Sequence, residues 1–86
     1  MTQEELREAL AQFIHDEQWT GWMRYFTNKC ERNSDGSLTV PAGYIAALER
    51  QMNTSYSELP EAEQDSDRNE ADRILAILRP IIVLED

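Results

Sequence analysis

The sequence predicts a mainly α-helical fold of three to four helices in one small domain spanning residues 1–86. Two observations carry this prediction. Apolar residues recur every three or four positions in several separate stretches, whereas only one very short stretch, near residues 37–40, alternates apolar and polar residues. No internal repeat or low-complexity linker divides the chain. A domain of this length buries only about 60 to 65 percent of the surface of its unfolded chain, which leaves little room for a deep active site.

The first helix is predicted to begin at about residue 3, because Thr2 and Glu5 have the spacing of a capping box. Two apolar sets follow, and on a common helix axis they point to nearly opposite sides. They are Leu6, Ala9, Leu10, Phe13 and Ile14, and then Trp19, Trp22, Met23, Phe26 and Cys30. Because the phase changes near Asp16, we expect a bend or break between His15 and Gln18. One long helix covered on different sides along its length is the alternative.

Residues 33–36, Asn-Ser-Asp-Gly, predict a turn, and the short extended segment follows them. Pro41 suits the first position of a second helix. The apolar face of that helix is expected to consist of Ala42, Ile45, Leu48 and Met52.

The last helix is predicted to begin near Pro60, with acidic residues at its positive N-terminal end, and to stop at Arg79-Pro80. Its buried face is expected to contain Ala71, Ile74, Leu75 and Leu78. The apolar run 81–84 comes next. We expect this tail to dock on the domain's own core, with pairing in a homodimer as the alternative.

The composition excludes several classes of function. Seventeen acidic against eight basic residues give a net charge of −9, which disfavours binding to nucleic acid and to anionic membranes. With Cys30 as the one cysteine, an internal disulfide and a cysteine-based zinc site are excluded. The chain has no signal peptide pattern and no apolar run of the ~18 residues that span a membrane. We therefore expect a cytoplasmic protein.

Catalysis and metal binding have little support in the sequence. His15 is the one histidine, and Cys30 lies on an apolar helix face about four turns away from it if the helix is continuous. The acids of residues 61–67 lack the glycine-centred loop of calcium sites. We expect no enzyme, no metal and no cofactor.

Residues Tyr56 to Arg68, read as YSELPEAEQDSDR, follow the pattern aromatic, x, Glu-Leu, Pro or Ser, Glu, x, Glu, x, x, x, Asp-Arg. This stretch resembles the signature of the RyR domain, named after the ryanodine receptor and also found alone in bacterial and phage proteins. His15-Asp16-Glu17-Gln18-Trp19 is similar to the family's His-Glu-x-x-Trp region, so the resemblance covers about residues 12–79. Ser55 and Gln64 depart from the usual Pro and Lys. The resemblance implies a non-catalytic module that binds a nucleotide-derived second messenger.

Aromatic and basic side chains form a candidate site for such a ligand. Tyr25, Lys29 and Arg32 fall on one helical strip that borders Trp22. Rings of this kind stack on a base, and cations bind phosphate. The same strip is also typical of an ordinary boundary between core and solvent. The candidate ligand-binding residues are Trp22, Tyr25, Lys29, Arg32, Tyr56 and Arg68.

Three residues are expected to be structural. His15 and Trp19 lie four positions apart, so on an unbroken helix the imidazole stacks on the indole as a core histidine. Asp67 falls on the apolar side of the last helix. A buried carboxylate there needs hydrogen bonds, from His15, from Tyr56 or from backbone amides.

Two functions from different classes remain open. One is the ligand-binding module, with a small nucleotide-like ligand as its partner. The other is an acidic interaction or inhibitor protein that occupies a basic surface on a partner protein. Its array of carboxylates is Glu58, Glu61, Glu63, Asp65, Asp67, Glu70 and Asp72.

Overall fold

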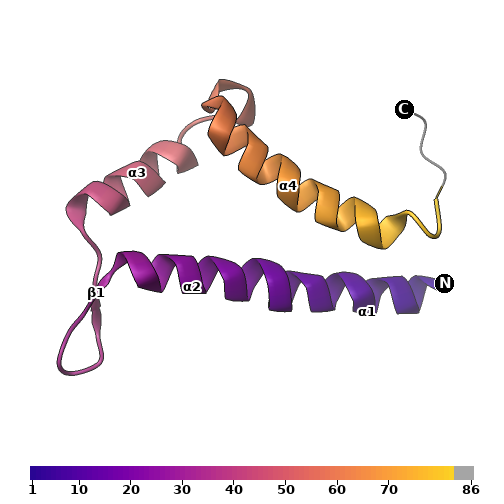
Figure 1. Cartoon of the computed structure of the whole chain (residues 1–86), viewed down its shortest axis with the longest axis horizontal. Coiled ribbons are helices and arrows are strands. Elements are labelled where there is room, and N and C mark those ends of the chain that lie inside the picture. Colours follow the sequence, from indigo (N-terminus) through magenta and orange to yellow (C-terminus); the bar gives the residue numbers. More distant parts are fainter. Residues whose placement is uncertain (83–86) are drawn as a thin grey trace.

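The structure, a computed structural model, describes residues 1–82 and confirms the mainly α-helical class (Figure 1). In chain order its elements are α1 (Gln3–Phe13), the π-helical η1 (Ile14–Trp19), α2 (Thr20–Lys29), β1 (Glu31–Arg32), β2 (Leu38–Thr39), α3 (Ala42–Met52), the 3₁₀ turn η2 (Tyr56–Glu58) and α4 (Glu61–Leu78).

The elements α1, η1 and α2 form one long helix, which begins with the predicted capping box (Figure 1). The Thr2 hydroxyl accepts a hydrogen bond from the Glu5 N–H at 3.1 Å, and the Glu5 carboxylate accepts one from the Thr2 N–H at 3.4 Å. Two N–H groups that have no partner within the helix are thereby satisfied.

The prediction of a bend or break between His15 and Gln18 is wrong. The chain stays helical through η1, where hydrogen bonds span five residues instead of four. A π-helical turn contains more residues than an α-helical turn. The apolar side chains before and after η1 therefore lie on different sides of the long helix, although the helix is not interrupted. The Thr20 hydroxyl donates to the His15 carbonyl at 2.9 Å. The alternative of one long helix covered on different sides therefore describes the molecule.

A two-stranded antiparallel hairpin follows the long helix, with Glu31 opposite Thr39 and Arg32 opposite Leu38. In its turn the Asp35 carboxylate accepts hydrogen bonds from the Ser37 hydroxyl at 2.6 Å and the Ser37 N–H at 2.9 Å. These bonds lower the pKa of Asp35. The extended segment at residues 38–39 was predicted, but its partner β1 was not, because two polar residues carry no alternation signal.

Replacement of glycine by alanine is expected to have opposite effects on stability in the long helix and in the hairpin. Gly21 lies in α2, and a methyl group added there meets no atom within 4 Å, so Gly21→Ala is expected to stabilise the fold by about 0.5–1 kcal/mol. Gly36 has φ +88°, so Gly36→Ala is expected to destabilise it by about 1–2 kcal/mol. Urea unfolding measured at one protein concentration tests both. A destabilised Gly21→Ala variant would contradict a continuous helix at this point.

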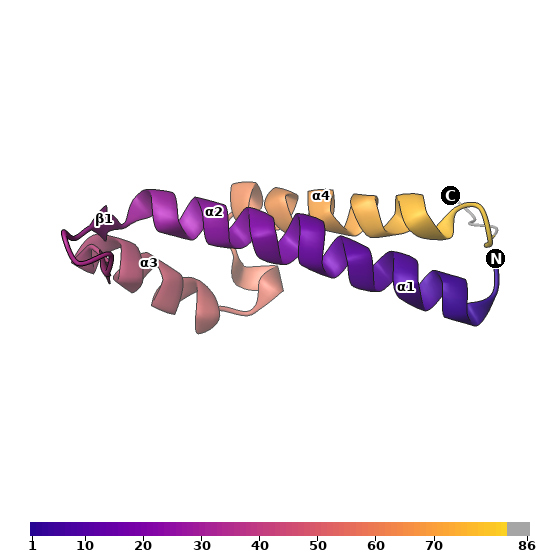
Figure 2. The ribbon, with the colours of Figure 1, turned by 90° about the horizontal axis from the view of Figure 1, so that it is seen from below.

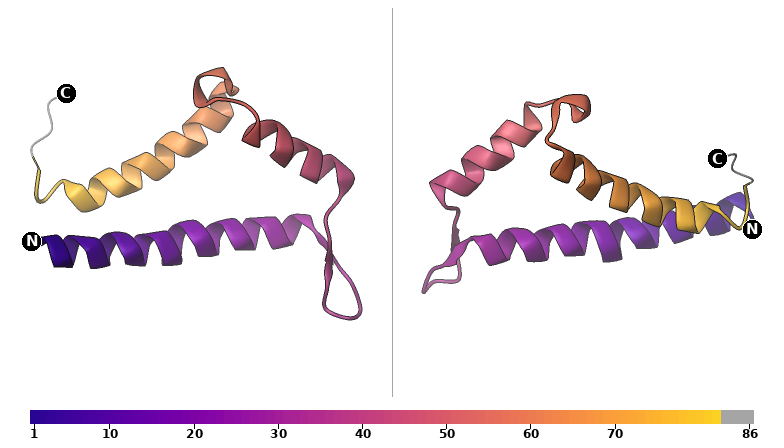
Figure 3. Two further views of the ribbon diagram at one scale, coloured as in Figure 1. Left: turned by 180° about the vertical axis from the view of Figure 1, so that it is seen from behind. Right: turned by 45° about the horizontal axis from the view of Figure 1, so that its top comes forward.

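The helices α3 and α4 lead back from the hairpin toward the N-terminal part of the long helix (Figures 1 and 3). Tyr44 of α3 packs its ring against Tyr25 and Phe26 of α2, with centroid distances of 6.4 and 5.9 Å. Arg50 of α3 forms an ion pair with Glu63 of α4 at 2.7 Å. As predicted, α4 begins directly after Pro60 and ends at Leu78.

The helices form a single layer. Viewed down the shortest axis of the molecule, no helix covers another (Figure 1), and the edge-on view shows a thin plate (Figure 2). The dimensions are 49 × 33 × 16 Å, and the radius of gyration is 16.9 Å, compared with about 12 Å for a compact domain of this length. Much of the apolar surface is therefore not covered by the chain itself.

The core is correspondingly small. Among the described residues Phe13 is the one buried apolar side chain, at 8% exposed, and it lies where α4 packs on α1. Ile74, Leu75 and Leu78 of α4 are half-buried, but Ala71, predicted to be buried, is exposed.

The predicted face of α3 is mostly uncovered. Leu48 is half-buried, whereas Ala42 and Ile45 are exposed and Met52 is 75% exposed. Of the predicted docked tail, Ile81 is half-buried and Ile82 is exposed, and residues 83–86 lie outside the described part of the chain.

Candidate ligand-binding groove

A groove with a volume of about 530 Å³ lies between the long helix and α4. This volume falls in the range of about 300–1,000 Å³ that small-molecule sites occupy. Its lining consists of Glu17, Gln18, Gly21, Trp22 and Tyr25 from the long helix, and Ser66, Asp67, Glu70 and Arg73 from α4. The groove therefore joins residues about 40 to 55 positions apart in the sequence.

One wall of the groove is aromatic. Trp22 is the middle ring of a stack along the helix, 6.3 Å from Trp19 and 5.1 Å from Phe26, with nearly parallel planes. Residues three or four positions apart lie on one side of a helix, and this spacing produces the stack. The stack restricts the rotation of the Trp22 ring, which remains 47% exposed. Tyr25 continues the wall, and the Lys29 ammonium lies 5.2 Å from the centre of its ring.

The opposite wall, on α4, is rich in hydrogen-bond acceptors. Arg73 forms an ion pair with Glu17 of the long helix at 3.1 Å and lies 4.0 Å from Glu70. One carboxylate oxygen of Glu70 is buried and has no hydrogen-bond partner in the described structure. Asp67 is exposed and accepts no hydrogen bond within residues 1–82. Three carboxylates and one guanidinium give the lining a net negative charge.

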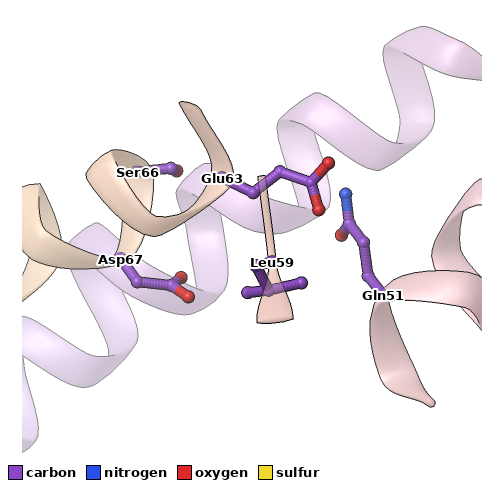
Figure 4. Close-up of a pocket in the computed structure, with 5 residues that line it drawn as sticks. All are labelled: Gln51, Leu59, Glu63, Ser66 and Asp67. Atoms are coloured by element: carbon purple, nitrogen blue, oxygen red, sulfur yellow. The ribbon is translucent and has the colours of Figure 1, made fainter. Parts of the chain in front are cut away.

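A smaller cavity of about 110 Å³ adjoins this acceptor wall (Figure 4). Leu59 lies at its centre, with Asp67 on one side and Glu63 on the other, and Gln51 reaches toward Glu63 from α3 (Figure 4). One oxygen of Glu63 binds Arg50, and the other is buried without a hydrogen-bond partner. Ser66 and Asp67 line both cavities, so the acceptor surface of α4 extends from the groove toward α3.

The structure brings together three of the six residues predicted to bind a ligand. Trp22 and Tyr25 line the groove, and Lys29 lies over the Tyr25 ring at its edge. Arg32 lies instead in the hairpin, where it donates a hydrogen bond to the Gly36 carbonyl at 3.0 Å. The helix ends at Lys29, which separates Arg32 from the predicted strip.

Tyr56 and Arg68 form a separate local pair outside the groove. The Arg68 guanidinium lies 6.0 Å from the centre of the Tyr56 ring. Arg68 also donates to Asp65 at 2.7 Å and to Gln64 at 3.1 Å. The bond to Asp65 raises the pKa of Arg68. This guanidinium is therefore paired on its own helix.

The three residues predicted to be structural do not have the environments that were predicted. His15 is exposed instead of being a core histidine, and Trp19 is 55% exposed. Asp67 is an exposed residue of the groove, so the prediction of a buried, hydrogen-bonded carboxylate is wrong. The physical reason is shared: the single layer of helices leaves these faces uncovered. Cys30, predicted to lie on an apolar helix face, is a half-buried free thiol.

Sequence reasoning missed the cross-helix part of the site. The ion pair between Glu17 and Arg73 joins residues 56 positions apart, and no local spacing rule links them. Glu70 and Arg73 are three positions apart on α4, so their pairing is local, but their place in a groove wall was not predicted. Gln18 and Gly21 carried no signal beyond their positions on the helix.

A comparison of the chain with models of protein families, with curated proteins and with solved structures finds no match. The resemblance to the RyR domain therefore stays a prediction. Within residues 1–82 no group of three or more His, Cys, Asp or Glu residues is placed to hold a metal ion. In the same part of the chain, no helix has the length and apolar character needed to cross a membrane.

Proposed function

We propose that this chain is a non-catalytic binding module and that the groove between α2 and α4 is its ligand site. One observation carries the proposal. The exposed rings of Trp22 and Tyr25 face the acceptor wall of Asp67 and Glu70 across a groove of ligand size. Binding sites for small molecules combine an apolar or aromatic surface with a few convergent polar groups in this way.

The side chains that line the groove indicate what kind of ligand it would bind. A flat heterocycle would stack on Trp22 and Tyr25, and its amino, ring N–H or hydroxyl groups would donate to Asp67 and Glu70. A phosphate inside the groove would be repelled by these carboxylates. The Lys29 ammonium at the Tyr25 ring is the nearby cation that is free of ion pairs within the described residues. We therefore propose a nucleobase-containing ligand whose base lies in the groove and whose phosphate, if present, lies near Lys29.

Titration calorimetry with nucleosides, mononucleotides and cyclic dinucleotides tests this proposal. Loss of one stacking ring typically weakens binding by about 1–3 kcal/mol, so Tyr25→Ala is expected to raise the dissociation constant about 5- to 150-fold. Tyr56→Ala removes the same side chain outside the groove and is the matched control. Asp67→Asn is expected to weaken ligands that bear amino donors. Equal losses for Tyr25→Ala and Tyr56→Ala, or no binding by any compound of the series at 1 mM, would contradict the site.

A second function, that of an acidic interaction protein, is supported by a different surface. Glu61 and Asp72 of α4 lie outside the lining of the groove, are exposed and make no ion pair within residues 1–82. A basic partner protein would be attracted to this surface, and its binding would weaken with salt. Replacement of Glu61 and Asp72 by Gln and Asn leaves the groove intact and would weaken such a complex, whereas ligand binding would not change.

A further inference from the structure

The single layer of helices leaves the chain with more exposed surface than a monomer of its size. The accessible surface is 6948 Å², compared with about 5,200 Å² expected for a compact monomer of the same mass. The excess is about 1,700 Å². Stable domains pack at least two layers of secondary structure around a shared core, and this chain supplies one layer.

The most exposed apolar part of the long helix is free of charge. Ile14, Gln18, Trp19 and Trp22, here called the aromatic surface, line an open apolar depression. Ile14 and Trp19 are 56% and 55% exposed. An isoleucine side chain and two indole rings on one helix would ordinarily be removed from water.

We infer that a second copy of this chain docks on the aromatic surface and supplies the missing layer, so that the working unit is a two-fold symmetric dimer. Across a two-fold axis each surface meets itself, and an uncharged apolar surface is complementary to itself. A charged partner would find no opposite charge among these four side chains. The excess of the whole chain is large enough for such an interface: a contact that extends outward from the aromatic surface and removes the excess of both chains buries about 3,400 Å², within the 2,000–5,000 Å² of obligate homodimers.

Docking at this place would leave the proposed ligand site open, although the two surfaces share residues. Gln18 and Trp22 line both the aromatic surface and the groove between α2 and α4. A second chain on the aromatic surface would cover the outer side of Trp22 and leave its groove side free. This relation between the dimer and the ligand site rests on the proposed function, whereas the inference of a dimer does not.

The net charge gives the dimer a distinctive dependence on salt. Each chain carries −9, so two chains repel each other at long range, while the contact itself is apolar. Salt screens charges that lie further apart than about 8–10 Å. Self-association is therefore expected to strengthen as salt is raised. A complex between the acidic surface and a basic partner would weaken under the same change.

Sedimentation equilibrium of the full chain between 1 µM and 1 mM tests the inference. The mass is expected to reach twice the 10.0 kDa of one chain at the high end of this range and to fall on dilution. The two tryptophans of the protein, Trp19 and Trp22, both belong to the aromatic surface, so their fluorescence is expected to shift to longer wavelength on dilution. Ile14→Glu combined with Trp19→Glu is expected to weaken self-association at least about 100-fold, since the added charges lack partners.

Asn28→Glu is the control for each added charge, because it places one carboxylate at an exposed position of α2 outside the aromatic surface. It is expected to keep the mass of the unsubstituted chain. A mass of 10.0 kDa throughout the concentration range, a closed assembly larger than two, or a dimer that survives the double substitution would overturn the inference. If the double variant does not fold, as judged by circular dichroism, the dilution shift of the unsubstituted chain decides alone. A dimer that binds no nucleoside or nucleotide would uphold this inference and contradict the proposed function.

Discussion

Phe13→Ala is expected to lower the free energy of unfolding by about 3 kcal/mol. Phe13 is the one buried apolar side chain of the described residues, and it lies at the crossing of α1 and α4. Truncation removes the transfer free energy of the ring and leaves a cavity that two helices cannot easily close. In a domain with a total stability of about 5–15 kcal/mol this is a large fraction. Urea unfolding followed by circular dichroism measures the loss.

Met52→Ala is the matched control for Phe13→Ala. Met52 is also a large apolar residue within a helix, but it is 75% exposed. Its truncation is expected to change stability by less than about 0.5 kcal/mol, as is usual for surface positions. All variants need the same protein concentration, because dissociation of a dimer contributes to the measured stability. Equal losses at Phe13 and Met52 would show that the crossing of α1 and α4 is not the core.

Asp16→Pro is expected to cost about 3 kcal/mol or more, because Asp16 lies inside a continuous helix. Proline removes one backbone N–H and its ring clashes with the preceding turn. The residues of the long helix that line the groove all follow this position, whereas α4 packs on α1 before it. A kink at Asp16 would therefore change the distance between the two walls of the groove, so the variant is also expected to lose ligand affinity. Far-ultraviolet circular dichroism and urea unfolding report both the helix content and the stability.

Asp16→Ala separates the backbone effect from loss of the side chain. Asp16 is exposed, and alanine is a better helix former, so this variant is expected to be neutral or slightly stabilised. A chain with a break between His15 and Gln18 would instead tolerate proline well. Equal stability of Asp16→Pro and Asp16→Ala would therefore restore the interrupted helix that the apolar periodicity alone predicts.

The proposed ligand site and the proposed dimer interface use mostly different residues of the long helix. Tyr25 lines the groove, Ile14 and Trp19 line the aromatic surface, and Trp22 lines both. Substitutions at Tyr25 and at Ile14 therefore report the two proposals separately. A substitution at Trp22 is expected to affect both, so it does not discriminate between them.

The sequence by itself determined the local structure. The Thr2 and Glu5 capping box, the turn before Leu38, and the prolines at positions 41, 60 and 80 act through neighbouring residues, so their spacing predicts where helices begin and end. The strip of Tyr25 and Lys29 that borders Trp22 was likewise visible, because residues three or four apart share one side of a helix.

Only the tertiary structure decided which faces are covered. Periodicity assumes that each apolar stripe meets a partner within the same chain, and on that assumption His15 and Asp67 were predicted to be buried. The helices instead form one layer, so both side chains are exposed. The groove between α2 and α4 and the ion pair between Glu17 and Arg73 depend on the angle at which α4 returns to the long helix. That angle is set by packing between residues distant in sequence, which no local pattern encodes.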